Sequence, residues 1–119
     1  MITLLTAALM AASLPTASVA DGPTCQGGLC AEFRLTDTAM YAYGSFDQPA
    51  DSYNELTVTL YAFTKGGSRP EPLTSAQANG LGRLEATTPG DSGGYLAVFA
   101  CAEIPPRDPW DTEFKVCDS

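Results

Sequence analysis

The residues best suited to acid–base or metal chemistry are two groups of carboxylates. Asp47, Asp51 and Glu55 form the first group, and the second, around Trp110, contains Asp108, Asp111, Glu113 and Asp118. Paired carboxylates can hydrolyse glycosides, and clustered carboxylates can hold calcium. Neither group has the spacing of a calcium loop, and a domain this small rarely offers a deep cleft. We therefore interpret both groups as a solvated acidic rim and expect no metal, no cofactor and no enzymatic activity.

A second chemical candidate is the segment Gly90-Asp91-Ser92-Gly93-Gly94. These five residues resemble the active-site loop of chymotrypsin-like serine proteases, in which the serine is the nucleophile. The resemblance implies a histidine that accepts the serine proton, and this sequence has no histidine. We therefore interpret the segment as a turn, because glycine permits positive φ and short polar side chains bond to nearby backbone. The alternative, a serine activated by Lys65 or Lys115, has no supporting feature in the sequence.

Aromatic side chains form the candidate binding surface. Tyr41 and Tyr43 share one face of a predicted strand, and Tyr61 and Phe63 share one face of the next. If these strands are neighbours, the four rings form a platform for a sugar or a partner protein. We favour the alternative, in which the rings are partly buried and stabilise the sheet. Trp110 is expected to cover one end of the core, and the alternative is an exposed anchor.

Length and charge limit the remaining function classes. The chain has 119 residues, which allows one domain. It carries 14 acidic and 6 basic residues, for a net charge of −8. A surface that neutralises phosphates must be basic, so we expect no nucleic-acid partner.

The first twenty residues have the pattern of a secretory signal peptide. An uncharged apolar run from Ile2 to Leu14 is followed by Pro15, and Ser18-Val19-Ala20 offers small residues for cleavage. The run is too short for a membrane anchor, which must cross about 30 Å of hydrocarbon. We expect cleavage after Ala20, which leaves a single secreted domain at residues 21–119 with no membrane partner. The lack of a basic residue before the run favours a eukaryotic source over a bacterial one.

Four cysteines follow this segment, and their even number predicts two disulfides in an oxidising compartment. They are Cys25, Cys30, Cys101 and Cys117. A local scheme pairs Cys25 with Cys30 and Cys101 with Cys117, whereas a nested scheme pairs Cys25 with Cys117 and Cys30 with Cys101. The spacing does not separate the two schemes, but it does not fit a zinc site.

Alternation of apolar and polar residues predicts an all-β domain. The predicted strands lie at residues 32–36, 40–46, 56–64, 82–87, 95–102 and 112–116. In the clearest of them, Leu56, Val58, Leu60 and Ala62 share one face. Thr74-Ser75-Ala76-Gln77 matches a capping box and predicts at most one short helical turn, ended by Asn79-Gly80. We expect a small antiparallel β-sandwich or barrel of about six strands, stapled by two disulfides.

These features together predict a small secreted, disulfide-stabilised, acidic binding protein. In its plan the chain resembles the small secreted cysteine-containing proteins of filamentous fungi, which implies an effector-like role if the source is fungal. The expected partner is an extracellular protein or glycan, bound by a monomer. The alternatives are a carbohydrate-binding module that uses the tyrosine-rich strand face, a small carboxylate enzyme, and a small periplasmic bacterial protein.

Overall fold

The computed structural model describes residues 22–95, 97–106, 110 and 113–119. The predicted signal peptide at residues 1–20 lies outside them. The described residues form strands and no helix. In chain order the strands are β2 (Thr24–Gln26), β3 (Leu29–Leu35), β4 (Met40–Phe46), β5 (Tyr53–Phe63), β6 (Glu71–Leu81), β7 (Leu84–Thr87), β8 (Ala97–Ile104) and β9 (Phe114–Asp118).

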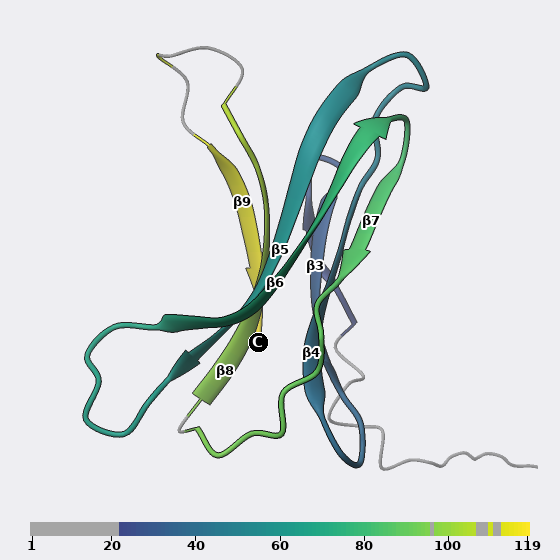
Figure 1. Cartoon of the computed structure of the whole chain (residues 1–119). Coiled ribbons are helices and arrows are strands. Elements are labelled where there is room, and N and C mark those ends of the chain that lie inside the picture. The colour runs from purple at the N-terminus through teal and green to yellow at the C-terminus, as the bar shows by residue number, and fades with distance from the viewer. Residues whose placement is uncertain (1–21, 96, 107–109, 111–112) are drawn as a thin grey trace, which may run out of the picture.

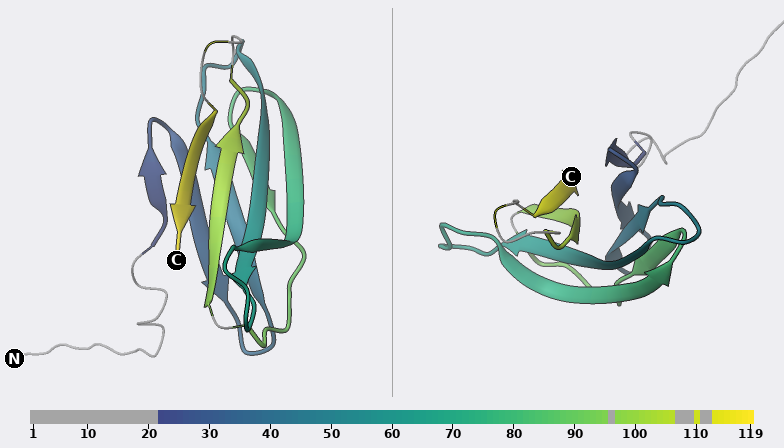
Figure 2. Two further views of the ribbon diagram at one scale, coloured as in Figure 1. Left: turned by 90° about the vertical axis from the view of Figure 1, so that its left-hand side faces the viewer. Right: turned by 90° about the horizontal axis from the view of Figure 1, so that it is seen from above.

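Two antiparallel four-stranded sheets pack face to face (Figures 1 and 2). One sheet has the order β2-β3-β4-β7 and the other has the order β6-β5-β8-β9. The chain crosses between the sheets after β4, after β6 and after β7, whereas β5–β6 and β8–β9 are hairpins within one sheet. The predicted antiparallel β-sandwich is confirmed, with eight strands in place of six.

The core lies between the sheets and follows the predicted alternation. On β5, the side chains of Leu56, Val58, Leu60 and Ala62 are all fully buried, and of the residues between them Thr57 and Tyr61 are partly exposed, whereas Thr59 is also buried. The same pattern on the other strands adds Leu29, Ala31, Met40, Ala42, Leu84, Ala100, Ala102, Ile104 and Val116 to the core.

Gly44 on β4 lies where the facing sheet comes close. A Cβ at this position would lie 2.5 Å from Val58 Cγ2 and 3.1 Å from Ala102 Cβ. The φ angle of Gly44 is not positive. Space, and not backbone conformation, therefore requires glycine here.

The predicted helical turn at Thr74–Gln77 is wrong, because these residues lie inside β6 and pair with β5. A helix N-cap would satisfy only local backbone N–H groups and would stabilise the segment by roughly 1 kcal/mol. Pairing with β5 instead gives the backbone of the whole segment hydrogen-bond partners. Ala78 packs against the core. The Gln77 side chain donates to Thr57 Oγ1 on β5 at 3.5 Å.

The local disulfide scheme is the observed one. Cys25 pairs with Cys30, and Cys101 pairs with Cys117. In each case the two residues stand directly opposite each other on adjacent strands, with Cα atoms 4.1 Å apart. The first bridge holds the unpredicted short strand β2 against β3. Two disulfides are compatible with an extracellular or periplasmic location.

Asp118 joins the two sheets along one edge. Its Oδ2 accepts a hydrogen bond from the Phe33 backbone N–H at 2.8 Å, and its Oδ1 accepts one from Thr24 Oγ1 at 2.8 Å. Phe114, at the start of β9, packs close against Gly27 in the β2–β3 turn. The last strand is thus fixed to the first hairpin as well as to β8.

Candidate functional site

The four rings considered as one platform lie on opposite outer faces of the sandwich. Tyr41 and Tyr43 alternate with buried residues of β4, whereas Tyr61 and Phe63 alternate with buried residues of β5. β4 and β5 belong to different sheets, because the chain crosses over between them. The two strands are therefore not neighbours, and the four rings do not form a single patch. All four side chains are half-buried.

The ring and the hydroxyl of Tyr43 are both in contact with other side chains of the same molecule. The Arg34 guanidinium lies 4.1 Å from its ring centroid, and its hydroxyl donates to Glu85 Oε1 at 2.8 Å. Burial, and then the Glu85 carboxylate, raise the pKa of Tyr43. Hydrogen bonds from Tyr43 and Arg83 lower the pKa of Glu85, and Arg83 also pairs with Asp47. These contacts match the cross-strand stabilising interpretation of this face.

Tyr61 and Phe63 belong to a ring cluster on the outer face of the other sheet. The Tyr61 ring stacks on Phe99 with centroids 5.3 Å apart, and Phe63 lies 6.1 Å from Phe99 in a tilted arrangement. Lys115 Nζ lies 5.1 Å from the Tyr61 centroid. We call Tyr61, Phe63 and Phe99 the aromatic cluster. Phe99 is not singled out by the sequence because its strand is apolar on both faces, which hides the alternation.

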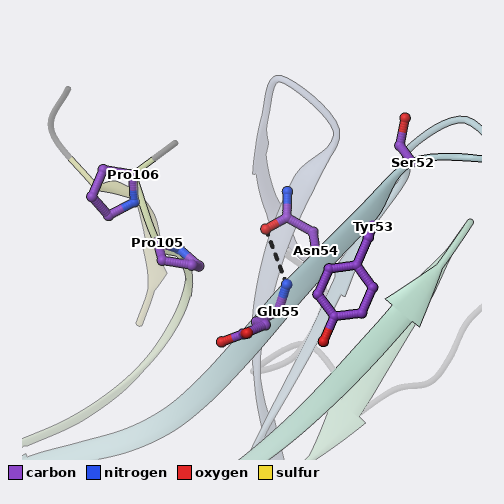
Figure 3. Close-up of a pocket in the computed structure, with 6 residues that line it drawn as sticks. All are labelled: Ser52, Tyr53, Asn54, Glu55, Pro105 and Pro106. Carbon is purple, nitrogen blue, oxygen red and sulfur yellow. Dashed lines mark hydrogen bonds between the residues drawn. The ribbon is translucent and has the colours of Figure 1, made fainter. Parts of the chain in front are cut away.

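A groove of about 350 Å³ lies at the end of the sandwich where β5 begins (Figure 3). Its lining consists of Ser52, Tyr53, Asn54, Glu55, Pro105 and Pro106. Tyr53 is 59% exposed, and Leu81, which stands opposite it on β6, is 60% exposed. An open groove with exposed apolar walls is suited to binding a partner.

Trp110 follows Pro106 on the β8–β9 connection and is 79% exposed. The expectation that it covers the core is therefore wrong. Periodicity places residues within strands, but it says nothing about where a loop residue lies, so only the structure distinguishes a cover from an exposed side chain. We call the exposed apolar side chains at this end of the sandwich, Tyr53, Leu81, Pro105, Pro106 and Trp110, the end surface; Trp110 is not among the residues that line the groove.

The strand pairing also brings carboxylates together next to this end. Glu55 lines the groove, and Glu103 lies two residues before Pro105 on β8. Burial is the main cause that raises the pKa of Glu103, followed by the nearby carboxyl of Glu113, while Lys115 opposes both. The two carboxylate groups identified along the sequence do not include Glu103, because the β8–β9 hairpin is what brings it close to Glu113.

The other carboxylates of the two predicted groups are dispersed. Asp47 pairs with Arg83, and Asp118 holds β9 against β3. Asp108 and Asp111 lie outside the described residues. In the described ranges, no group of three or more His, Cys, Asp or Glu side chains could hold a metal ion.

The segment from Gly90 to Gly94 is an irregular connection and forms no regular turn, although the Asp91 side chain bonds to nearby backbone as predicted. Asp91 Oδ1 accepts a hydrogen bond from the Gly93 N–H at 2.9 Å, and Gly93 and Gly94 have φ angles of 99° and 97°. The Asp91 backbone exchanges two hydrogen bonds with Met40 at the start of β4. Ser92 is exposed. The segment therefore fixes the approach to β8.

The fold is a disulfide-stapled antiparallel β-sandwich, an architecture that hosts many unrelated functions. Comparison with known proteins finds no family model, no curated protein and no solved structure that matches this chain. In the part of the chain that the structure describes, no helix has the length and apolar character to cross a membrane.

Proposed function

We propose that this protein is a small secreted binding protein that acts as a monomer and contacts an extracellular protein or glycan through the end surface. The supporting observation is the exposure of Tyr53, Leu81 and Trp110, at 59%, 60% and 79%. Exposed apolar patches with polar rims are typical of interaction sites, and aromatic residues are enriched among those that dominate binding energy.

The groove supports binding in preference to hydrolysis. Glu55 is the carboxylate among its lining residues. Carboxylate hydrolases need two acids on opposite sides of the scissile bond. Opposite Glu55 stand Pro105 and Pro106, which offer rigid apolar contact and no proton (Figure 3).

The test begins with mature protein immobilised and exposed to extracellular fluid of its source. A retained component is identified and purified, and its Kd is then measured by titration calorimetry. We expect Trp110→Ala and Tyr53→Ala each to weaken binding by about tenfold, because aromatic anchors dominate such contacts. The retained component should keep its mass, which distinguishes binding from hydrolysis.

Leu35→Ala is the matched control, because Leu35 is 50% exposed but lies at the end of β3 in the other sheet. It should leave Kd unchanged. An equal loss in Leu35→Ala, or no loss in either end-surface variant, would show that the end surface is not the contact.

A further inference from the structure

The strand β6 has a free backbone edge. It lies at the end of its sheet, and within the described part of the chain it pairs with β5 alone. With 11 residues it is longer than the other edge strands, β2, β7 and β9, which have 3, 4 and 5. All residues of β6 are at least partly exposed, including those that face the core. An edge strand presents unpaired N–H and C=O groups to which another strand can bond.

The hairpin that joins β5 to β6 shows which backbone groups of β6 are free. The Gly82 N–H donates to the Ser52 C=O at 3.3 Å, so these two residues form a hydrogen-bonded pair. Hydrogen-bonded and non-hydrogen-bonded pairs alternate along an antiparallel ladder. Counting back along the register from this pair gives the residues whose N–H and C=O point away from β5, which are Ser75, Gln77 and Asn79.

The disulfide between β8 and β9 gives the same assignment. The Cα atoms of Cys101 and Cys117 are 4.1 Å apart, which is the short spacing of a non-hydrogen-bonded pair. The backbone of Cys101 therefore points to β5, where it bonds to Thr59. Since the N–H and C=O of Thr59 point to β8, its partner on β6, Ser75, has no bond from β5.

This edge lacks the features that usually prevent strands from pairing. Among the described residues, no hydrogen bond reaches the N–H or C=O of Ser75, Gln77 or Asn79. Exposed edges are usually protected by charged side chains, by proline or by short length. Residues 73–81 contain no charged residue and no proline. The edge is therefore long, uncharged and open.

We propose that the edge of β6 binds an extended, uncharged segment of a partner protein, which adds to the sheet as a further strand. The free groups lie on alternate residues and repeat at roughly 6.8 Å, the spacing at which a second strand offers its own N–H and C=O. Main-chain hydrogen bonds of this kind give the affinity in β-strand addition. A charge in the segment would have no ion partner along residues 73–81.

This inference rests on the function proposed above and deepens it, because it selects a protein over a glycan as the partner. A glycan does not carry the matching row of N–H and C=O groups. The edge is also continuous with the end surface, since β6 ends at Leu81. A second copy of this chain fits less well, because each copy has a net charge of −8 and the two would repel.

Amide hydrogen exchange of the mature protein, measured by NMR, tests the pairing residue by residue. In the free protein, the amides of Ser75, Gln77 and Asn79 should exchange quickly, and those of Ala76 and Ala78 slowly. The probe is a blocked seven-residue peptide of alternating threonine and valine, added in large excess. Its control is the same peptide with every amide N-methylated, which keeps the side chains and loses the donors.

We expect the probe to slow exchange at Ser75, Gln77 and Asn79 by about tenfold or more, and the N-methylated control to leave it unchanged. No slowing at these residues, or equal slowing by both peptides, would overturn the proposal. Sedimentation that shows self-association of the free protein would also overturn it, because a second copy would then be the occupant.

Gln77→Pro and Gln77→Thr are matched variants. Proline removes the outward N–H and is tolerated in an edge strand where that group faces solvent, whereas threonine keeps the N–H. We expect Gln77→Pro to weaken probe binding by about tenfold and Gln77→Thr to leave it unchanged. Equal binding by the two variants would contradict the proposal. If Gln77→Pro does not fold, the comparison of the two peptides on the wild-type protein still decides.

Trp110→Ala separates this result from the end-surface test. The variant keeps the edge of β6, so it should bind the probe normally. Normal probe binding, together with no effect of Trp110→Ala on the retained component, would refute the end surface and support the edge. A retained component that proves to be a glycan would refute the choice of a protein and leave the end surface standing.

Discussion

Gly44 determines how closely the two sheets pack. Even alanine at this position would force Val58 and Ala102 to move. We expect Gly44→Ala to lower the free energy of unfolding by about 1–3 kcal/mol, the usual cost of overpacking a core. Denaturant titration measures this change.

A compensating substitution isolates the cause. Val58→Ala removes the methyl group that a new Cβ at position 44 would meet at 2.5 Å. Gly44→Ala/Val58→Ala should therefore lose less stability than the sum of the two single variants. Strict additivity would mean that the contact is not the source of the loss.

Glu103 predicts a pH dependence of stability. Its pKa is raised above the ordinary value of 4.5, first by burial and then by Glu113. Folding thus favours the neutral acid, so its contribution is present below the ordinary pKa and is lost as pH rises through the folded pKa. We expect Glu103→Gln to melt at a higher temperature than wild type at about pH 7, with no difference at about pH 3. Glu113→Gln should reduce the pH-dependent gap, and an unchanged gap would contradict the assigned cause.

At the residue scale, the sequence predicts burial well wherever alternation is long. The inward faces of β4 and β5 follow directly from Met40, Ala42 and the alternate residues of β5. The relation of Tyr41 to Tyr61 could not be predicted, because it depends on which sheet each strand joins. Trp110 lies in a connection, where no periodicity constrains its exposure.

At the scale of elements, each disulfide staples two adjacent strands. The sequence separations are 5 and 16. Loop-closure entropy then gives about 2 kcal/mol for the shorter loop and about 3 kcal/mol for the longer one. We expect Cys101→Ala/Cys117→Ala to destabilise more than Cys25→Ala/Cys30→Ala in urea unfolding, also because Cys101 is buried. A larger loss of stability in Cys25→Ala/Cys30→Ala would show that holding β2 against β3 contributes more to the free energy of unfolding than the short loop implies.

β2 and β6 show where element prediction fails. β2 has three residues, too few for a period to be visible. In β6, the local sequence Thr74-Ser75-Ala76-Gln77 matches a helix capping box. Its strand conformation depends instead on pairing with β5, a segment that lies elsewhere in the sequence. The choice between the two disulfide schemes could not be predicted for the same reason. The register of the hairpins decides it, and the spacing of the cysteines does not.

At the scale of the whole molecule, removal of the leader remains a prediction. We expect material secreted by its native source to consist of residues 21–119, beginning at Asp21. Intact mass spectrometry, with thiol titration, tests this directly. A polypeptide that still begins at Met1, or one with four free thiols, would contradict the secretory interpretation.

The class of fold could be predicted because it depends on patterning summed over many residues. The partner could not, because recognition depends on a few surface side chains that the topology brings together. Phe99, Tyr61 and Lys115 come from three strands and meet through pairing alone.

The Asp118 carboxylate has a consequence for biogenesis. It binds Phe33 and Thr24, which precede it by 85 and 94 residues. During synthesis the β2–β3 hairpin is made before Asp118, so the Phe33 amide lacks this acceptor until β9 has been made. The contact between the first hairpin and β9 therefore forms only after β9 has been synthesised, and a chain released before β9 would lack it.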